Sequence, residues 1–210
     1  SGTVSLLLQP GKTTSNTLAA ENPEKFYKAI TFDGTGQTQA ISGLAFQPDL
    51  VWMKNSDTAQ SHALVDSVRT RSKVLFPDSP GAQQTSGSTE DLISFDNNGF
   101  SVGTPARAGS TNNSGSSIVA WSWRAGGNSN TFNIDGVGYS SYDNLQSANS
   151  SLPASSTSGM ITPSGMSIGV KQGFSITKYV GTGTAASVPH GLGKAPEFVI
   201  IKHLDGSNDW

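Results

Sequence analysis

The sequence predicts an all-β protein: a β-sandwich repeat of the jelly-roll-like kind, followed by an extended connector and the start of a second copy. Three observations lead to this prediction. Short apolar runs, alternating or continuous, are separated by turns rich in Gly, Asn and Ser. No stretch of the sequence shows a strong helical period with capping residues. The segment 177–205 repeats the pattern of the segment 29–57.

Composition narrows the class of protein and of partner. Charged residues make up 13% of the 210 residues and the net charge is −2, which disfavours nucleic acid as a partner. The longest apolar runs are far shorter than a membrane-spanning helix, so we expect no membrane insertion. With no cysteine but four Trp and nine Phe, stability must come from buried sheet or from assembly with other chains. These features favour an assembly-dependent extracellular or virion-type protein.

The two similar segments share turn residues as well as apolar residues. Glycines and a proline at matching offsets imply matching backbone turns, so we expect both segments to follow the same strand–turn–strand path. With one inserted residue after the first three matches, Gly34, Thr35, Gly36, Gly43, Leu44, Pro48, Val51, Lys54 and Asp57 correspond to Gly181, Thr182, Gly183, Gly191, Leu192, Pro196, Val199, Lys202 and Asp205.

The first part of the chain divides into a short leading segment and one repeat. Residues 1–26 are interpreted as one strand, "VSLLL", with a linker, or as a tail leaving an earlier element. Residues 27–127 are interpreted as the first sandwich repeat. Its first strands are predicted at "YKAITF", "DLVWMK", "HALVDSV" and "SKVLF".

Two further signals complete the first repeat. In "DLISFDNNGFSVG", two β-rich runs flank Asn97-Asn98-Gly99, which predicts a hairpin whose turn has positive φ. "SSIVAWSWRAGG" alternates cleanly and ends at a Gly pair. From these strands we expect buried core positions at Phe32, Leu44, Leu50, Trp52, Phe95, Phe100, Val119 and Trp121.

The second part of the chain has a different character. Residues 128–172 are poor in charge and in large apolar groups, and are interpreted as a Ser- and Gly-rich connector or arm, with a strand or two near "NIDGVGY" and "SIGV". Residues 173–210 are interpreted as the start of a second, incomplete repeat. Without the later strands, the "FVII" strand would expose apolar faces and an unpaired edge. We expect either that the natural protein continues past Trp210, which we favour, or that another chain supplies the missing strands.

Four stretches resemble a known family in their order and spacing. They are "ITFDGTGQTQAISGLAFQPDLVWMKN", "LVDSVRTRSKVLFPD", "ISFDNNGFSVG" and "VAWSWRAGG". Over residues 15–210 the sequence resembles the repeated β domain of tail fibre and receptor-binding proteins of tailed bacteriophages, especially marine ones. One departure is Thr70, where that pattern leads us to expect Gly after the Arg of "DSVR". The resemblance implies a β-sandwich unit on a virion fibre and brings no assigned catalytic site.

Patterns typical of catalysis are weak in this sequence. His62 and Asp66 would lie on one face of a strand, but roughly 13 Å apart by rise alone, too far for a hydrogen-bonded catalytic pair. Glu90 and Asp91 are adjacent and would point to opposite faces, unlike the close carboxylate couple of a glycosidase. His190 corresponds to Ser42 in the first segment. We therefore expect no enzyme, no catalytic residue and no cofactor.

Patterns for metal and phosphate binding are also missing. There is no cysteine and no pair of histidines at zinc-binding spacing, so we expect no metal site. "DGSND" at 205–209 and "DNNG" at 96–99 offer oxygen ligands for a structural ion, with ordinary turns as the alternative. The "GTG" stretches lack the remaining residues of a phosphate-binding loop and are interpreted as hairpin residues.

Ligand-binding residues stay unassigned at this level. The side chains of Trp52, Trp121, Trp123 and Trp210 are either core or platforms on which sugars stack. The loops "SGSTE" and "AGSTNNSGSS" are either plain solvated loops or adaptable hydrogen-bonding surfaces.

The function we expect is that of a structural and host-recognition component of a phage tail fibre, with cell-surface glycans as candidate ligands. The alternative is a virion decoration or spacer module without receptor binding, and a glycan depolymerase is a third option. The expected partners are other fibre or virion chains, as a homo-oligomer with a trimer as one option, and a host surface glycan. The expected location is the virion, so the protein is extracellular when it acts.

Overall fold

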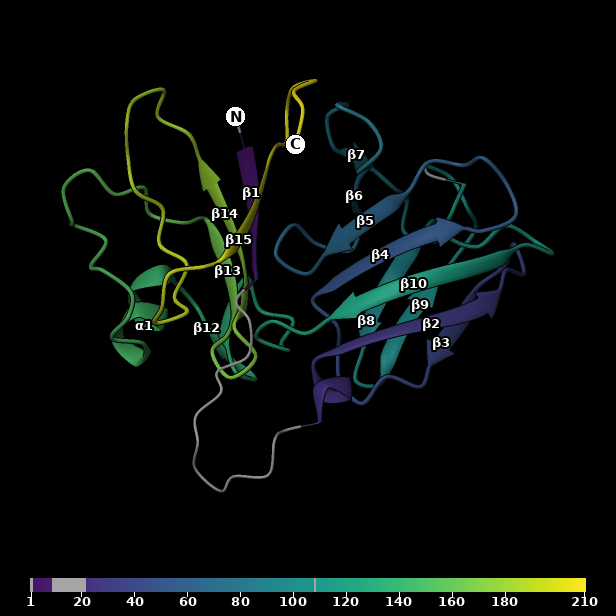
Figure 1. Cartoon of the computed structure of the whole chain (residues 1–210), viewed down its shortest axis with the longest axis horizontal. Coiled ribbons are helices and arrows are strands. Elements are labelled where there is room, and N and C mark those ends of the chain that lie inside the picture. Colours follow the sequence, from purple (N-terminus) through teal and green to yellow (C-terminus); the bar gives the residue numbers. More distant parts are fainter. Residues whose placement is uncertain (1, 9–21, 108) are drawn as a thin grey trace.

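The computed structural model describes residues 2–8, 22–107 and 109–210, and it confirms the all-β fold class. The described residues form three sheets, with one short α-helix, α1, and one 3-10 turn, η1 (Pro23–Lys25). Neighbouring strands are antiparallel except for one parallel pair, β11 with β13. Figure 1 shows the sheet that contains β1 (Gly2–Leu8) beside the other two sheets, with α1 (Tyr142–Ala148) at the end opposite to β2 (Tyr27–Asp33) and β3 (Gln39–Ser42).

The sheets are named by their position. The central sheet has the order β2 (Tyr27–Asp33), β10 (Ser117–Trp123), β4 (Leu50–Asn55), β5 (Ala63–Asp66), β6 (Lys73–Leu75) and β7 (Gln84–Thr85). The small sheet has the order β3 (Gln39–Ser42), β9 (Gly99–Val102) and β8 (Leu92–Asp96). The outer sheet has the order β12 (Val137–Tyr139), β11 (Phe132–Ile134), β13 (Gly165–Gly169), β14 (Phe174–Val180), β1 (Gly2–Leu8) and β15 (Phe198–His203).

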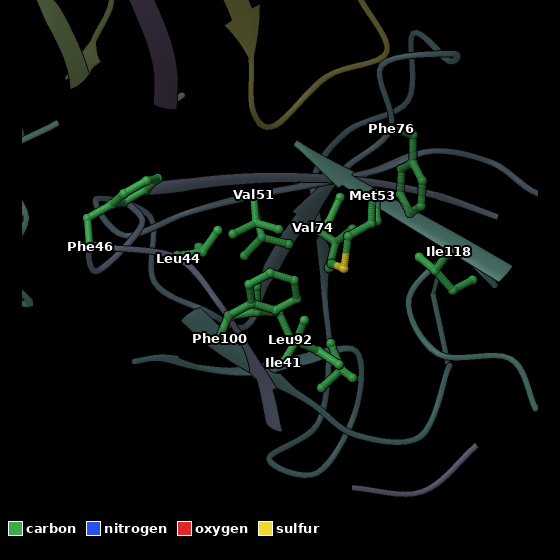
Figure 2. Close-up of a cluster of buried hydrophobic side chains, with 14 residues drawn as sticks. Ile41, Leu44, Phe46, Val51, Met53, Val74, Phe76, Leu92, Phe100 and Ile118 are labelled. Atoms are coloured by element: carbon green, nitrogen blue, oxygen red, sulfur yellow. The ribbon is translucent and has the colours of Figure 1, made fainter. Parts of the chain in front are cut away.

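Three apolar clusters hold these layers together. The first lies between the central and small sheets, where Val51, Met53 and Phe100 are completely buried (Figure 2). The second lies on the other face of the central sheet and joins it to the outer sheet, through Leu64 of one and Ile176 of the other. The third packs α1 on the outer sheet. Apolar clusters therefore lie on both faces of the central sheet.

Burial along β10 corrects part of the expected core. Ile118, Ala120 and Ser122 are completely buried, whereas Val119 and Trp121 are only half-buried. The prediction that Val119 and Trp121 are buried core positions is therefore wrong, because the opposite face of β10, with Ile118 and Ala120, packs in the cluster between the central and small sheets. Of the remaining expected positions, Leu44, Leu50 and Phe100 are buried, and Phe32, Trp52 and Phe95 are partly buried against the clusters.

The predicted hairpin forms, but its turn differs from the prediction. β8 pairs with β9, and Asp96 lies opposite Gly99. The expected positive φ is wrong, since neither Asn97, Asn98 nor Gly99 has one. Gly99 is needed for a different reason: a Cβ there would lie 1.9 Å from the carbonyl oxygen of Ile41 in the adjacent strand β3.

Residues 128–172 contain regular structure rather than only an extended connector. β11, β12 and β13 belong to the outer sheet, and α1 (Tyr142–Ala148) packs on that sheet through Tyr142 and Leu145. The Ser141 hydroxyl caps the helix by accepting a hydrogen bond from Asn144 N at 3.2 Å. The helix has only seven residues, too few for a recognisable apolar period.

The two similar sequence segments contain strands with corresponding bounds. β2 spans Tyr27–Asp33 and β14 spans Phe174–Val180, so each β14 residue lies 147 positions after its counterpart. β4 spans Leu50–Asn55 and β15 spans Phe198–His203, a shift of 148 positions that reflects the one-residue insertion. β1 lies between β14 and β15, as β10 lies between β2 and β4. In the second unit, β1 therefore takes the place that β10 has in the first. The same chain thus supplies one of the strands that are missing from the segment 173–210.

Candidate functional site

A half-buried aromatic surface lies on the face of the central sheet that the outer sheet covers only in part. Trp52 and Trp121 are cross-strand neighbours, and their ring centroids are 6.1 Å apart in an edge-to-face arrangement. Trp52 Nε1 donates a hydrogen bond to His62 Nδ1 at 2.9 Å, which fixes the orientation of the indole. Trp52 also packs against the cluster between the two sheets. Together, the three side chains form a pre-oriented aromatic surface.

A basic cleft lies where the first repeat meets the outer sheet. It is a cavity of about 220 Å³ lined by Lys25, Phe26, Arg124, Asp135, Lys171 and Gln172. Within the described part of the chain, no acidic side chain forms an ion pair with its three cations. Hydrogen bonds to the backbone fix two of the lining side chains, because the Gln172 amide donates to Arg124 O at 3.0 Å and Asp135 Oδ1 accepts from Val170 N at 3.0 Å. This arrangement suits an anionic or strongly polar ligand.

A buried carboxylate lies close to this junction. Asp49 is completely buried and accepts two backbone hydrogen bonds at 2.7 Å, from Ala125 and Gly127, on one oxygen. Its other oxygen accepts from the hydroxyls of Ser67 at 2.8 Å and Ser167 at 3.0 Å. Burial raises the pKa of Asp49, and the four hydrogen bonds oppose that rise. Since Asp49 precedes β4 and Ser167 lies in β13, this network links the central and outer sheets.

The residues weighed as catalytic pairs are not brought together. His62 contacts Trp52, whereas Asp66 forms a buried ion pair with Arg69, with Asp66 Oδ2 at 2.5 Å from Nε. Glu90 accepts from Gly87 N at 2.7 Å. His190 is half-buried, its pKa is lowered by burial, and its Nδ1 accepts from Leu192 N at 3.2 Å. Each of these groups thus has a local structural contact.

Asp91 fixes part of the two loops that the sequence left open as plain solvated loops or adaptable hydrogen-bonding surfaces. Asp91 is completely buried and accepts hydrogen bonds from the Thr111 hydroxyl at 2.9 Å and from Ala106 N at 3.0 Å. The Asn112 side chain is also buried and donates to Gly103 O at 2.8 Å. The segment 110–112 is therefore part of a buried polar network instead of a solvated loop.

The turn "DGSND", weighed as an ion site, surrounds the ammonium group of Lys202. Lys202 is completely buried, and its Nζ donates to Asn208 O at 2.6 Å and Pro80 O at 2.8 Å. Longer contacts reach His203 O at 3.1 Å and Gly206 O at 3.5 Å. Burial lowers the pKa of Lys202, and Asp209 opposes that shift. The carbonyl oxygens of this turn are therefore directed at a side-chain cation.

Two other kinds of feature are absent from the described residues: a metal-binding cluster and a membrane-spanning helix. Within residues 2–8, 22–107 and 109–210, no group of three or more His, Asp or Glu side chains is placed to hold a metal ion. Among the helices of those same ranges, none is long and apolar enough to cross a membrane.

The fold and these surfaces define an all-β protein of packed antiparallel sheets, with aromatic and basic surface sites. The chain belongs to the family described as Domain of unknown function (DUF7483), whose model matches residues 22–142 and again residues 132–210. No curated protein and no solved structure matches the chain significantly.

The residues of the aromatic surface could be suggested from the sequence, whereas those of the basic cleft could not. Trp52 and Trp121 were candidates by residue type alone, but their contact depends on the pairing of β4 with β10. Lys25, Arg124 and Lys171 come from three separate segments and share no pattern in the sequence. Only the fold brings them together.

Proposed function

We propose that this protein is a structural and host-recognition module of a phage tail fibre. The observation that supports this proposal best is the presence in one chain of two units with corresponding strands, β2–β10–β4 and β14–β1–β15. Tandem units of this kind build extended proteins, since each unit contacts its neighbours through a regular interface. The low share of charged residues, 13%, fits a surface used for assembly. No catalytic step is part of the proposal.

The recognition part of the proposal assigns a host glycan to the aromatic surface. Trp121 is half-buried and lies outside the three apolar clusters, so part of its ring is open to a ligand. Trp52, which is hydrogen-bonded to His62, packs edge-to-face against Trp121 and restricts the motion of its ring. This restriction lowers the entropic cost of stacking a sugar ring. The basic cleft would add selectivity for glycans that carry carboxylate or sulfate groups.

A glycan array with three proteins tests recognition. We expect the unmodified protein to bind a subset of glycans and Trp121→Ala to lose that binding at least about tenfold, a difference of about 1.4 kcal/mol. Lys171→Ala should lose binding only to acidic glycans. Circular dichroism and thermal melting must show that both variants remain folded. No binding by the unmodified protein would favour the spacer module without receptor binding.

Immunogold electron microscopy tests the location. Antibodies raised against this protein should label the tail fibres of phage particles that carry it. Label on the capsid would instead favour the decoration module, and particles without label would contradict a virion role. Because the array and the microscopy are separate experiments, either part of the proposal can fail alone.

A further inference from the structure

In the outer sheet, β1 lies between β14 and β15 in the same register as β10 lies between β2 and β4 in the central sheet. In the central sheet, Ile118 of β10 lies opposite Phe32 of β2 and Asn55 of β4. In the outer sheet, Thr3 of β1 lies opposite Tyr179 of β14 and His203 of β15. Tyr179 and His203 are the counterparts of Phe32 and Asn55. The pairing with β14 and the pairing with β15 therefore both make Thr3 the counterpart of Ile118.

The start of the two strands is held by the same contacts. Asp57 Oδ2 accepts from Ser117 N at 2.7 Å, and Ser56 N donates to Ser117 O at 2.9 Å. In the outer sheet, Asp205 accepts from Gly2 N, and Leu204 N donates to Gly2 O at 2.7 Å. The turn after β15 therefore forms hydrogen bonds with the start of β1 in the same way as the turn after β4 does with the start of β10.

The two strands differ in how they are attached to their sheets. β10 is tied at both ends to the first repeat, because Gly34 N donates to Ser116 O at 2.8 Å and Arg124 N donates to Phe26 O at 2.8 Å. Among the described residues, β1 pairs with β14 and β15 alone, and the next described element, η1, begins at Pro23. All of these pairings are between segments more than 160 residues apart, so a β1 strand from another molecule can make the same contacts.

The region beside this position is apolar and uncovered. Phe198, Val199 and Ile201 of β15 are 50%, 46% and 47% exposed. Their counterparts in β4, namely Leu50, Val51 and Met53, are 3%, 0% and 0% exposed, because β5 and the other sheets cover them. Among the described residues, this edge of the outer sheet therefore presents uncovered apolar surface.

We propose that the position between β14 and β15 is a strand-acceptor site, and that β1 of a second copy of this chain occupies it in the assembled protein. Each copy offers one strand and one acceptor site. Exchange in one direction is heterologous, so copies join head to tail in an open series instead of a closed dimer. This inference deepens the assembly role proposed above but does not depend on a virion location or on glycan binding.

Cross-linking between two single-cysteine variants tests the exchange. The protein has no cysteine of its own, so Thr3→Cys and His203→Cys each carry one thiol on opposite sides of a single cross-strand pair. The two variants are mixed, unfolded in urea, refolded together and treated with a short bis-maleimide reagent. We expect a covalent dimer containing one molecule of each, whose yield rises with protein concentration.

A matched mixture controls for chance exchange. Thr31 and Val119 form a cross-strand pair between β2 and β10, which should stay within one molecule. Thr31→Cys and Val119→Cys, treated in the same way, should give little mixed dimer. Equal yields from the two mixtures, or no mixed dimer from the first, would overturn the proposal. Antibody label or glycan binding would be unaffected by that result.

Discussion

Ser167 and Asp49 lie 118 positions apart in sequence, yet the Ser167 hydroxyl donates a hydrogen bond to Asp49 Oδ1 at 3.0 Å. This contact joins β13 of the outer sheet to the residue that precedes β4 of the central sheet. Because Asp49 also accepts from Ala125 N and Gly127 N, one carboxylate links three segments of the chain. It does so without a cationic partner, which makes its protonation state relevant to stability.

Asp49→Asn should be tolerated and should remove a pH-dependent component of stability. The amide oxygen can accept from both backbone amides, and the two serine hydroxyls can turn to accept from the amide nitrogen. Since burial raises the folded-state pKa of Asp49 above its ordinary value of 3.8, the stability that this carboxyl group contributes is fully present below pH 3.8 and is lost as pH rises through the folded pKa. Wild type should therefore lose stability relative to Asp49→Asn as pH is raised across that window. Urea unfolding over a pH series measures the difference, and an unchanged difference would contradict it.

Asp49→Leu is the matched control for the same site. It removes every acceptor and leaves four donors in a buried region, so we expect a loss of about 3 kcal/mol or more. If Asp49→Leu were as stable as Asp49→Asn, the network would have no structural importance.

Thr70→Gly should stabilise the protein by roughly 0.5–1 kcal/mol. Thr70 has a φ of 81°, in the left-handed region that a β-branched residue rarely adopts. Glycine relieves that strain, although part of the gain is offset by the larger entropy of the unfolded chain. Thr70→Ala keeps the strained conformation and should give no comparable gain in thermal unfolding experiments. A destabilised Thr70→Gly would mean that the Thr70 side chain makes a stabilising contribution.

Gly99→Ala should destabilise the protein by about 2 kcal/mol or more, since the new Cβ would overlap the carbonyl oxygen of Ile41 in β3. Gly181→Ala is the control, because no heavy atom lies within 4 Å of the Cβ position there. That variant should stay within about 0.5 kcal/mol of wild type. Chemical denaturation of both variants gives the comparison, and similar midpoints would argue against the close approach of β9 to β3.

Lys202→Met should cost about 3 kcal/mol, because it removes the buried ammonium group that donates to the carbonyl oxygens of Pro80, His203 and Asn208. Lys54, its counterpart, donates to Asn55 O at 2.6 Å and Thr58 O at 3.1 Å but is only half-buried. Lys54→Met should therefore cost less, about 1 kcal/mol. Guanidinium unfolding ranks the two variants, and the reverse order would show that burial does not decide the effect.

Local patterns were enough to predict much of the fold. Alternating or continuous apolar runs indicated β2, β4 and β10, and the Asn97-Asn98 turn indicated the β8–β9 hairpin, because these features depend on residues close in sequence. The position of β1 could not be predicted in this way. Its partners lie at the far end of the chain, and a single apolar run carries no information about which strands it will pair with.

The candidate surfaces show the same limit. Residue type alone identified Trp52 and Trp121 as candidates, but not which of them would be core. The answer depends on how far the outer sheet extends over the central sheet, which is a property of tertiary packing. The sequence did not indicate Arg124 as a binding residue, because the role of a cation depends on the charges and the cavity that surround it.

The position of β1 inside the outer sheet has a mechanical consequence. The strand is paired along both edges, through Gly2–Leu8 with β14 on one side and through Thr3–Leu8 with β15 on the other. Backbone hydrogen bonds in antiparallel pairs run perpendicular to the strands. Tension applied through the segment after Leu8, along the strand axis, therefore loads both rows of hydrogen bonds in shear. Many bonds must then fail together, whereas a strand peeled from a sheet edge loses them one at a time.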